Sequence, residues 1–199
     1  MSSVKVVVLG SDSVGKSALV VRYLTGRFIG EYASNADLLY KKQIKVDGRH
    51  LNLEVFDPCS QLCHNRMELA EQVRWADAFV VVYEISDRVT FLEAKSLICN
   101  FKKSCKSITS QPIFLVGNKQ DLCHAREVSE EDARFFAVET GTLFCELSVA
   151  EHPEDVVIMF VQLFRTVQVV AKARDRRRHS GSKSMTRLIN VFGKRRQSV

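Results

Sequence analysis

The 199-residue chain is long enough for one globular domain with an extension, and its 46% hydrophobic and 26% charged residues are ordinary for a soluble protein with a sizeable core. The net charge of +6 is uneven, because ten Lys or Arg and a single acid follow from Lys172 onward, whereas the remainder is mildly acidic. No apolar run approaches the roughly 20 residues of a membrane span, and the six scattered cysteines include no C-x-x-C pair, which indicates reduced thiols rather than a disulfide framework.

Apolar runs alternate with helical patterns along the chain. The first run, 4–10, is rich in valine, as expected for a strand buried on both faces, and it is too short for a signal peptide. The pattern at 15–28 is helical, and two strand patterns then flank Asp47 and Gly48, a hairpin signal. Further strands are predicted at 78–86, 112–118 and 143–148, and helices at about 65–75, 88–104, 129–140 and 153–173. This alternation predicts an α/β fold with a mostly parallel sheet and helices on both faces.

A phosphate-binding loop is predicted directly after the first strand. The stretch GSDSVGKS fits G-x-x-x-x-G-K-[ST] in full and opens a predicted helix, and a chance glycine-rich turn would have to match all of these features. Gly10 and Gly15 let successive N–H groups face an anion at the helix N-terminus. Lys16 supplies a charge for the outer phosphates, and the Ser17 hydroxyl can ligate Mg²⁺. The candidate residues are Gly10, Ser11, Asp12, Ser13, Val14, Gly15, Lys16, Ser17 and Ala18.

A second motif, VGNKQDL at 116–122, predicts recognition of guanine. It stands at the end of a buried-strand pattern, about a hundred residues after the phosphate loop. The Asp121 carboxylate can accept hydrogen bonds from the N1–H and the amino group of guanine, a donor pair that adenine lacks. Asn118 is expected to brace the loop, and the stem of Lys119 to cover one face of the base.

These motifs resemble those of the Ras superfamily of small GTP-binding proteins over roughly residues 4–170. The resemblance is carried by GSDSVGKS, Asp57, Gln61, NKQD and, more weakly, LSVA at 147–150. Within the superfamily, the stretches 15–32, 75–88 and 116–129 look closest to the ras-related and estrogen-regulated growth inhibitor group. The resemblance implies the P-loop GTPase fold, with six strands in the order 2-3-1-4-5-6 and strand 2 antiparallel. The nucleotide, GDP or GTP, would lie at the carboxyl ends of the strands.

The resemblance also implies roles for individual residues. Gln61 would orient the attacking water, while Lys16 stabilises charge on the phosphates, so these two are the candidate catalytic residues. Phe28 would pack edge-on against guanine, a plain core phenylalanine being the alternative. Ser148 and the N–H of Val149 could meet the base, although the lysine that usually follows this motif is absent. The candidate Mg²⁺ ligands are Ser17, Asn35 and Asp57.

Three residues depart from the family pattern where hydrolysis is controlled. Ser60 occupies the hinge-glycine position, Asn35 stands where threonine is usual, and Asp12 replaces a glycine in the phosphate loop. Asp12 would repel the γ-phosphate and take space needed by Gln61. We therefore expect guanine nucleotide and Mg²⁺ to bind but GTP hydrolysis to be weak. Two alternatives stay open: a normal cycle in which the changes are compensated, and a non-catalytic scaffold that holds the nucleotide.

The chain divides into a predicted GTP-binding domain, 1–172, and a basic extension, 173–199. The last cysteine is Cys145 and residue 2 is Ser, so neither prenylation nor myristoylation is expected. Basic clusters flank an apolar stripe that has helical spacing. The stripe consists of Met185, Leu188, Ile189 and Phe192. This pattern suits an anionic membrane surface, a partner groove or calmodulin, and a solvated, disordered tail is the alternative.

The remaining expectations concern partners and location. Effectors or regulators are expected to contact 30–40 and 58–75, the segments where the resemblance places the two switches. No nucleic-acid-binding module is visible, so specific nucleic-acid binding is not expected. We expect a monomer in the cytoplasm, or in the nucleus because of the basic runs, and not a secreted protein.

Overall fold

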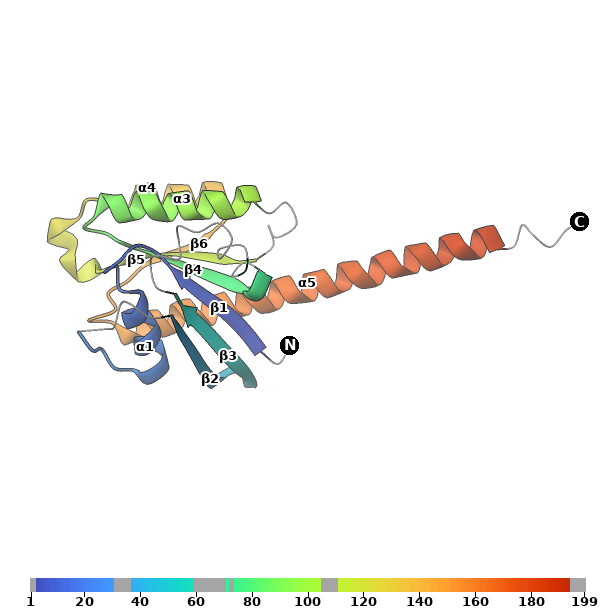
Figure 1. Cartoon of the computed structure of the whole chain (residues 1–199), viewed down its shortest axis with the longest axis horizontal. Helices are drawn as coiled ribbons and strands as arrows, with labels where there is room; N and C mark the ends of the chain where they lie inside the picture. The colour runs from blue at the N-terminus through green and yellow to red at the C-terminus, as the bar shows by residue number, and fades with distance from the viewer. Residues whose placement is uncertain (1–2, 31–36, 59–70, 72–73, 105–110, 194–199) are drawn as a thin grey trace, which may run out of the picture.

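The computed structural model describes residues 3–30, 37–58, 71, 74–104 and 111–193, with side chains beyond Arg176 left out. These residues form one six-stranded sheet in the order β2-β3-β1-β4-β5-β6 (Figure 1). The strands are β1 (Ser3–Leu9), β2 (Leu38–Val46), β3 (Arg49–Asp57), β4 (Ala78–Glu84), β5 (Ile113–Asn118) and β6 (Leu143–Glu146). Among these described strands only the pairing of β2 with β3 is antiparallel, so the predicted α/β architecture and strand order are confirmed.

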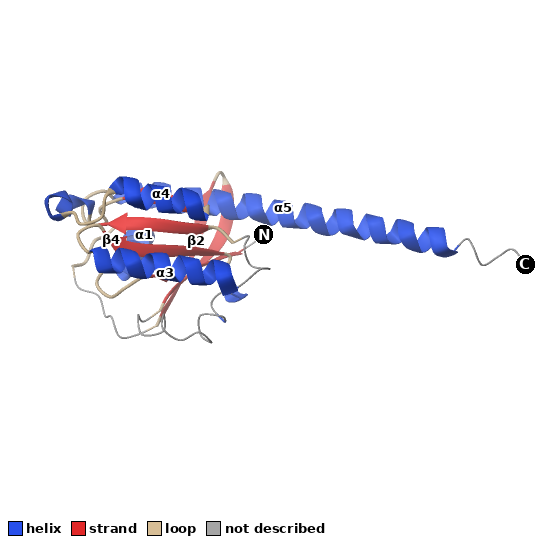
Figure 2. Ribbon diagram, turned by 90° about the horizontal axis from the view of Figure 1, so that it is seen from above, coloured by secondary structure: helices blue, strands red, loops and turns tan. Residues whose placement is uncertain are grey.

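Helices cover both faces of the sheet, α1 and α5 on one side and α3 and α4 on the other (Figures 1 and 2). The helices are α1 (Lys16–Thr25), α3 (Arg88–Ser104), α4 (Glu130–Thr140), α5 (Pro153–Gly193) and a short 3-10 helix (Gln120–Ala125). The helix expected at about 65–75 falls almost entirely outside the described residues.

The two cores follow from the alternation of side chains along each strand. In β4, Val80 and Val82 join the core beneath α1 and α5, whereas Phe79 and Val81 join the core beneath α3 and α4. Every β4 residue from Ala78 to Tyr83 is buried, as expected for a central parallel strand that has both faces covered.

The ends of two helices differ from the sequence expectation. The α1 helix stops at Thr25 because Gly26 adopts a left-handed conformation, φ 72°, and donates its N–H to the carbonyl of Arg22. The α5 helix continues twenty residues beyond the predicted end at 173 and projects past the sheet (Figure 1). Its backbone therefore crosses the proposed boundary between domain and extension without a break.

The first part of α5 is a core helix, although it is apolar enough to suggest a membrane span. By length and apolar composition alone, the segment Pro153–Arg176 could cross a membrane. Its inner face, however, is buried against the sheet and α1, and the ring of Phe160 stacks on that of Tyr23 with their centroids 4.1 Å apart. Burial in the protein accounts for the apolar residues on this inner face, whereas Val157, Ile158 and Val169 are exposed.

The described cysteines are free thiols. These are Cys99, Cys123 and Cys145. Burial raises the pKa of the Cys145 thiol to about 12, so it stays protonated and unreactive at neutral pH.

Candidate functional site

The candidate site lies where β1, β3, β4 and β5 reach their carboxyl ends. The phosphate loop follows β1 and curls through unusual backbone angles, φ 144° at Gly10, 62° at Ser13 and 96° at Gly15. A Cβ atom at Gly10 would lie 2.2 Å from the carbonyl oxygen of Val82, and one at Gly15 would lie 2.3 Å from Nδ2 of Asn118. The loop can therefore pack against β4 and β5 only with glycine at these two positions.

Lys16 is enclosed by the loop that it follows. It is the first residue of α1, and 8% of it is exposed. Its Nζ donates hydrogen bonds to the carbonyl oxygens of Gly10 (3.0 Å) and Ser11 (2.7 Å). A buried ammonium beside a helix N-terminus favours an anionic ligand such as a polyphosphate.

Ser17 and Asp57 bring two oxygen donors together beside this loop. The Ser17 hydroxyl donates to Oδ2 of Asp57 over 2.5 Å, and Asp57 is 3% exposed at the end of β3. Burial raises the pKa of the Asp57 carboxyl, while the hydrogen bond from Ser17 and the charge of Lys16 act in the opposite direction. A cation beside it would favour the ionised form, so proton and cation compete for this carboxylate.

This donor set fits Mg²⁺. Hydroxyl and carboxylate oxygens suit the ion, which usually takes only one or two protein ligands and completes its shell with water and phosphate. The described residues contain no group of three or more His, Cys, Asp or Glu side chains that could hold a metal ion.

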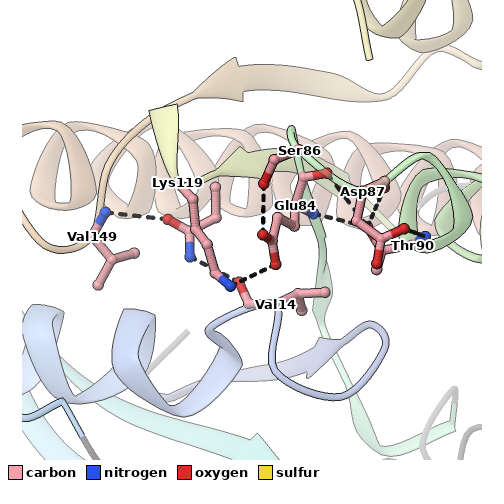
Figure 3. A network of polar contacts seen from close by, with 8 residues as sticks. Val14, Glu84, Ser86, Asp87, Thr90, Lys119 and Val149 are labelled. Atoms are coloured by element: carbon pink, nitrogen blue, oxygen red, sulfur yellow. Dashed lines mark hydrogen bonds and ion pairs between the residues drawn. The ribbon is translucent and has the colours of Figure 1, made fainter. Parts of the chain in front are cut away.

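Asn118 joins the phosphate loop to the loops that would bind a base. It is 3% exposed at the end of β5. Its Nδ2 donates to the carbonyl of Val14 (2.8 Å), and its Oδ1 accepts from the N–H of Val149 (3.2 Å); Figure 3 labels these two partners. The bridge places both loops in one site, and it occupies the Val149 N–H that the sequence suggested would face the base.

The Asp121 carboxylate is oriented by a neighbouring loop. The Ser148 hydroxyl, 1% exposed, donates to Oδ1 of Asp121 over 2.5 Å and accepts from the N–H of Glu151 (3.2 Å). Asp121 stands in the 3-10 helix that begins after Lys119, whose φ of 66° turns the chain sharply at the end of β5. A fixed carboxylate at this position can accept the paired donors of guanine.

Two acidic residues near the site were missed by sequence reasoning. Oε2 of Glu84 lies 2.5 Å from Nζ of Lys119, and the carboxylate of Glu93 in α3 accepts a hydrogen bond from the Ser11 hydroxyl. Glu84 could have been found, because it is a charged residue at the end of a buried strand, like Asp57. Glu93 had no such signal, since its position in α3 becomes meaningful only when the helix is packed.

Of the other predicted site residues, some are described by the structure and some are not. Asp12 and Ser13 are exposed on the phosphate loop, and Val14 and Ala18 are buried beneath it. Phe28 follows α1 with 44% of its surface exposed, which rules out the alternative that it is a core phenylalanine. Asn35 and Gln61 lie outside the described residues, as does most of 30–40 and 58–75.

Comparison with known proteins agrees with this arrangement. A model of the Ras family matches residues 5–169. The Ras-related and estrogen-regulated growth inhibitor-like proteins of Bos taurus and Homo sapiens are both 50% identical to the chain, in alignments that cover 100% and 95% of it and 100% and 94% of those proteins. The Homo sapiens Ras-like protein family member 11A is 38% identical, over 82% of this chain and 70% of its own length. The span matched by the family model contains all the loop residues that form the site.

Proposed function

Because the chain belongs to the Ras family of small GTPases, we propose that its site holds guanine nucleotide together with Mg²⁺ and hydrolyses GTP slowly. The observation that supports the proposal is the Asn118 bridge from Val14 to Val149, because the neighbouring Ser148 hydroxyl bonds Asp121, the carboxylate expected to select guanine. GTP binding and signalling follow from membership of the family. Binding of Mg²⁺ and slow hydrolysis are what we propose for this chain.

Catalysis would consist of positioning and electrostatic stabilisation. Lys16 and the N–H groups of its loop stabilise charge that develops on the phosphates. Ser17 and Asp57, with Asn35, would hold Mg²⁺, which when bound neutralises charge on the phosphate oxygens. Gln61 would orient the attacking water.

The slow rate is inferred from Asp12, Asn35 and Ser60. Asp12 is exposed on the phosphate loop and adds a negative charge where the terminal phosphate would lie. Asn35 offers a ligand with a different reach from threonine, and Ser60 lacks the freedom of a hinge glycine. Each change leaves the nucleotide-binding residues Lys16, Asn118 and Asp121 in place.

Replacing Asp12 by glycine is expected to speed hydrolysis. A like charge a few ångströms away contributes about 1 kcal/mol in water, so Asp12→Gly should raise the single-turnover rate about five- to tenfold. Asp12→Asn, which keeps the size but not the charge, should give part of that gain, and Asp132→Asn on α4 serves as the surface control. A parent rate at or above the roughly 3–5 × 10⁻⁴ s⁻¹ of Ras, unchanged by Asp12→Gly, would contradict the proposal.

The nucleotide that accompanies the freshly purified chain separates slow hydrolysis from a normal cycle, and the fate of added GTP separates both from a non-catalytic scaffold. Mostly GTP supports slow hydrolysis, and mostly GDP indicates a working cycle. A non-catalytic scaffold would keep its nucleotide while added GTP stays intact in every Asp12 variant.

The extension of α5 is proposed to bind an anionic membrane surface from the cytoplasm. The helical backbone reaches Gly193, and the sequence from Lys172 to the end carries ten Lys or Arg and a single acid. Each basic residue near an anionic surface contributes about 1 kcal/mol, so charge complementarity favours membrane over a neutral groove.

Sedimentation with vesicles tests this role. The full chain should pellet with phosphatidylserine-containing vesicles but not with pure phosphatidylcholine, and binding should weaken as salt is raised. Removing residues 174–199 should abolish the pelleted fraction. Equal pelleting of the full and shortened chains would contradict membrane docking, as would tight binding to calmodulin without any binding to anionic vesicles.

A further inference from the structure

Glu84 connects the base-binding loop to the sheet and to α3. It is the last residue of β4 and pairs in register with Asn118, the last residue of β5. Its Oε2 atom lies 2.5 Å from Nζ of Lys119, and its Oε1 atom accepts a hydrogen bond from the Ser86 hydroxyl over 2.6 Å. Figure 3 shows the carboxylate held between these two groups.

The backbone of Glu84 is fixed as firmly as its side chain. Its N–H donates to Oγ1 of Thr90 (3.0 Å), and the Thr90 hydroxyl donates to the carbonyl of Asp87 (2.8 Å). The Asp87 carboxylate accepts from the N–H of Val89 (2.8 Å) in the first turn of α3. Glu84, which pairs with Lys119, is therefore anchored to α3 as well as to β4.

This anchoring restricts a lysine that would otherwise be mobile. The side chain of Lys119 is 31% exposed and that of Glu84 is 18% exposed, so the pair is partly shielded from solvent. A free lysine side chain loses substantial rotamer entropy when it is ordered. With its ammonium held by Glu84, the stem of Lys119 is ordered before any ligand arrives.

We propose that Glu84 is a positioning residue for the guanine site, which keeps the Lys119 stem in place as a wall against one face of the base. This inference rests on the proposed function. The wall matters more here because Ala150 stands where a second lysine would cover the base. The Glu84 carboxylate contacts Lys119 and Ser86, so we expect it to act on the nucleotide through Lys119 and to slow nucleotide release.

Release of a fluorescent GDP analogue from the full chain with Mg²⁺ tests the inference. Glu84→Gln and Lys119→Met should each release the analogue about tenfold faster, with association unchanged. The double variant should be no faster than the faster single variant, because both changes remove the same interaction. Glu54→Gln, which breaks the Lys41–Glu54 pair on β2 and β3, is the matched control and should match the parent.

A comparison with inosine diphosphate separates the contact that Lys119 would make with the face of the base from the contacts that Asp121 would make with its edge. Inosine lacks the amino group that Asp121 would read but presents a similar face, so Glu84→Gln should speed its release by the same factor as that of GDP. Release from Glu84→Gln within twofold of the parent, or effects that multiply in the double variant, would overturn the inference alone. Failure of the parent chain to bind any GDP would overturn the proposed function as well.

Discussion

Replacing Asp121 by asparagine is expected to exchange the base preference of the site from guanine to xanthine. The introduced side-chain amide would present one acceptor and one donor, which matches the N1–H and the 2-carbonyl of xanthine but opposes the amino group of guanine. A site that hydrogen-bonds its ligand discriminates strongly when polar groups are left unpaired, so GDP affinity should fall at least about 100-fold. The Ser148 hydroxyl can still donate to the amide oxygen, which keeps the loop in place.

Competition between GDP and xanthosine diphosphate measures this exchange. Asp121→Asn should bind xanthosine diphosphate more tightly than GDP, and Asp132→Asn in the first turn of α4 should keep the parent preference. A parallel loss of both nucleotides would point to a damaged loop. Undiminished GDP binding would show that Asp121 does not read the base.

Gly15→Ala is the second change with a large expected effect, because its added methyl group would collide with the Asn118 side chain that links the two loops of the site. The new Cβ atom would lie 2.3 Å from Nδ2 of Asn118, and its backbone would have to keep φ 96°. Displacing Asn118 would break its hydrogen bonds to Val14 and Val149 together. We expect stability to fall by about 2 kcal/mol or more and GDP affinity to fall at least about 100-fold.

Gly26→Ala is a matched control at the other end of α1. Gly26 also has a positive φ, 72°, but a Cβ atom there would meet nothing within 4 Å. It should cost about 1 kcal/mol in the free energy of unfolding, measured in urea, and leave GDP affinity within about twofold. Equal effects of the two substitutions on GDP affinity would show that backbone strain, and not the collision with Asn118, controls binding.

The outline of the site could be predicted because its residues stand at the ends of buried strands. Asp57, Asn118 and the phosphate loop each follow an apolar run, and the carboxyl ends of parallel strands meet at one edge of the sheet. Residue types with a fixed chemical role, such as Lys16 after a glycine, carry their function in the sequence itself.

What could not be predicted depends on tertiary contacts. Two contacts form only once two loops and two strands are placed together. They are the hydrogen bond from the Val149 N–H to Asn118 and the ion pair of Glu84 with Lys119. The length of α5 was missed for a different reason. The periodic core contacts end near Val167, and the stripe of Met185, Leu188, Ile189 and Phe192 is separated from them by a basic cluster. The sequence therefore did not show that one helical backbone runs without a break to Gly193.

Calorimetry on the nucleotide-free chain tests the central claim most directly. Titration with GDP in the presence of Mg²⁺ should give one-to-one binding with a dissociation constant below about 1 μM, equivalent to more than about 8 kcal/mol, and ADP should give no comparable heat. Chelation of Mg²⁺ should weaken the binding through the loss of the ion that Ser17 and Asp57 are proposed to hold. An absence of binding heat for both GDP and GTP would contradict the account.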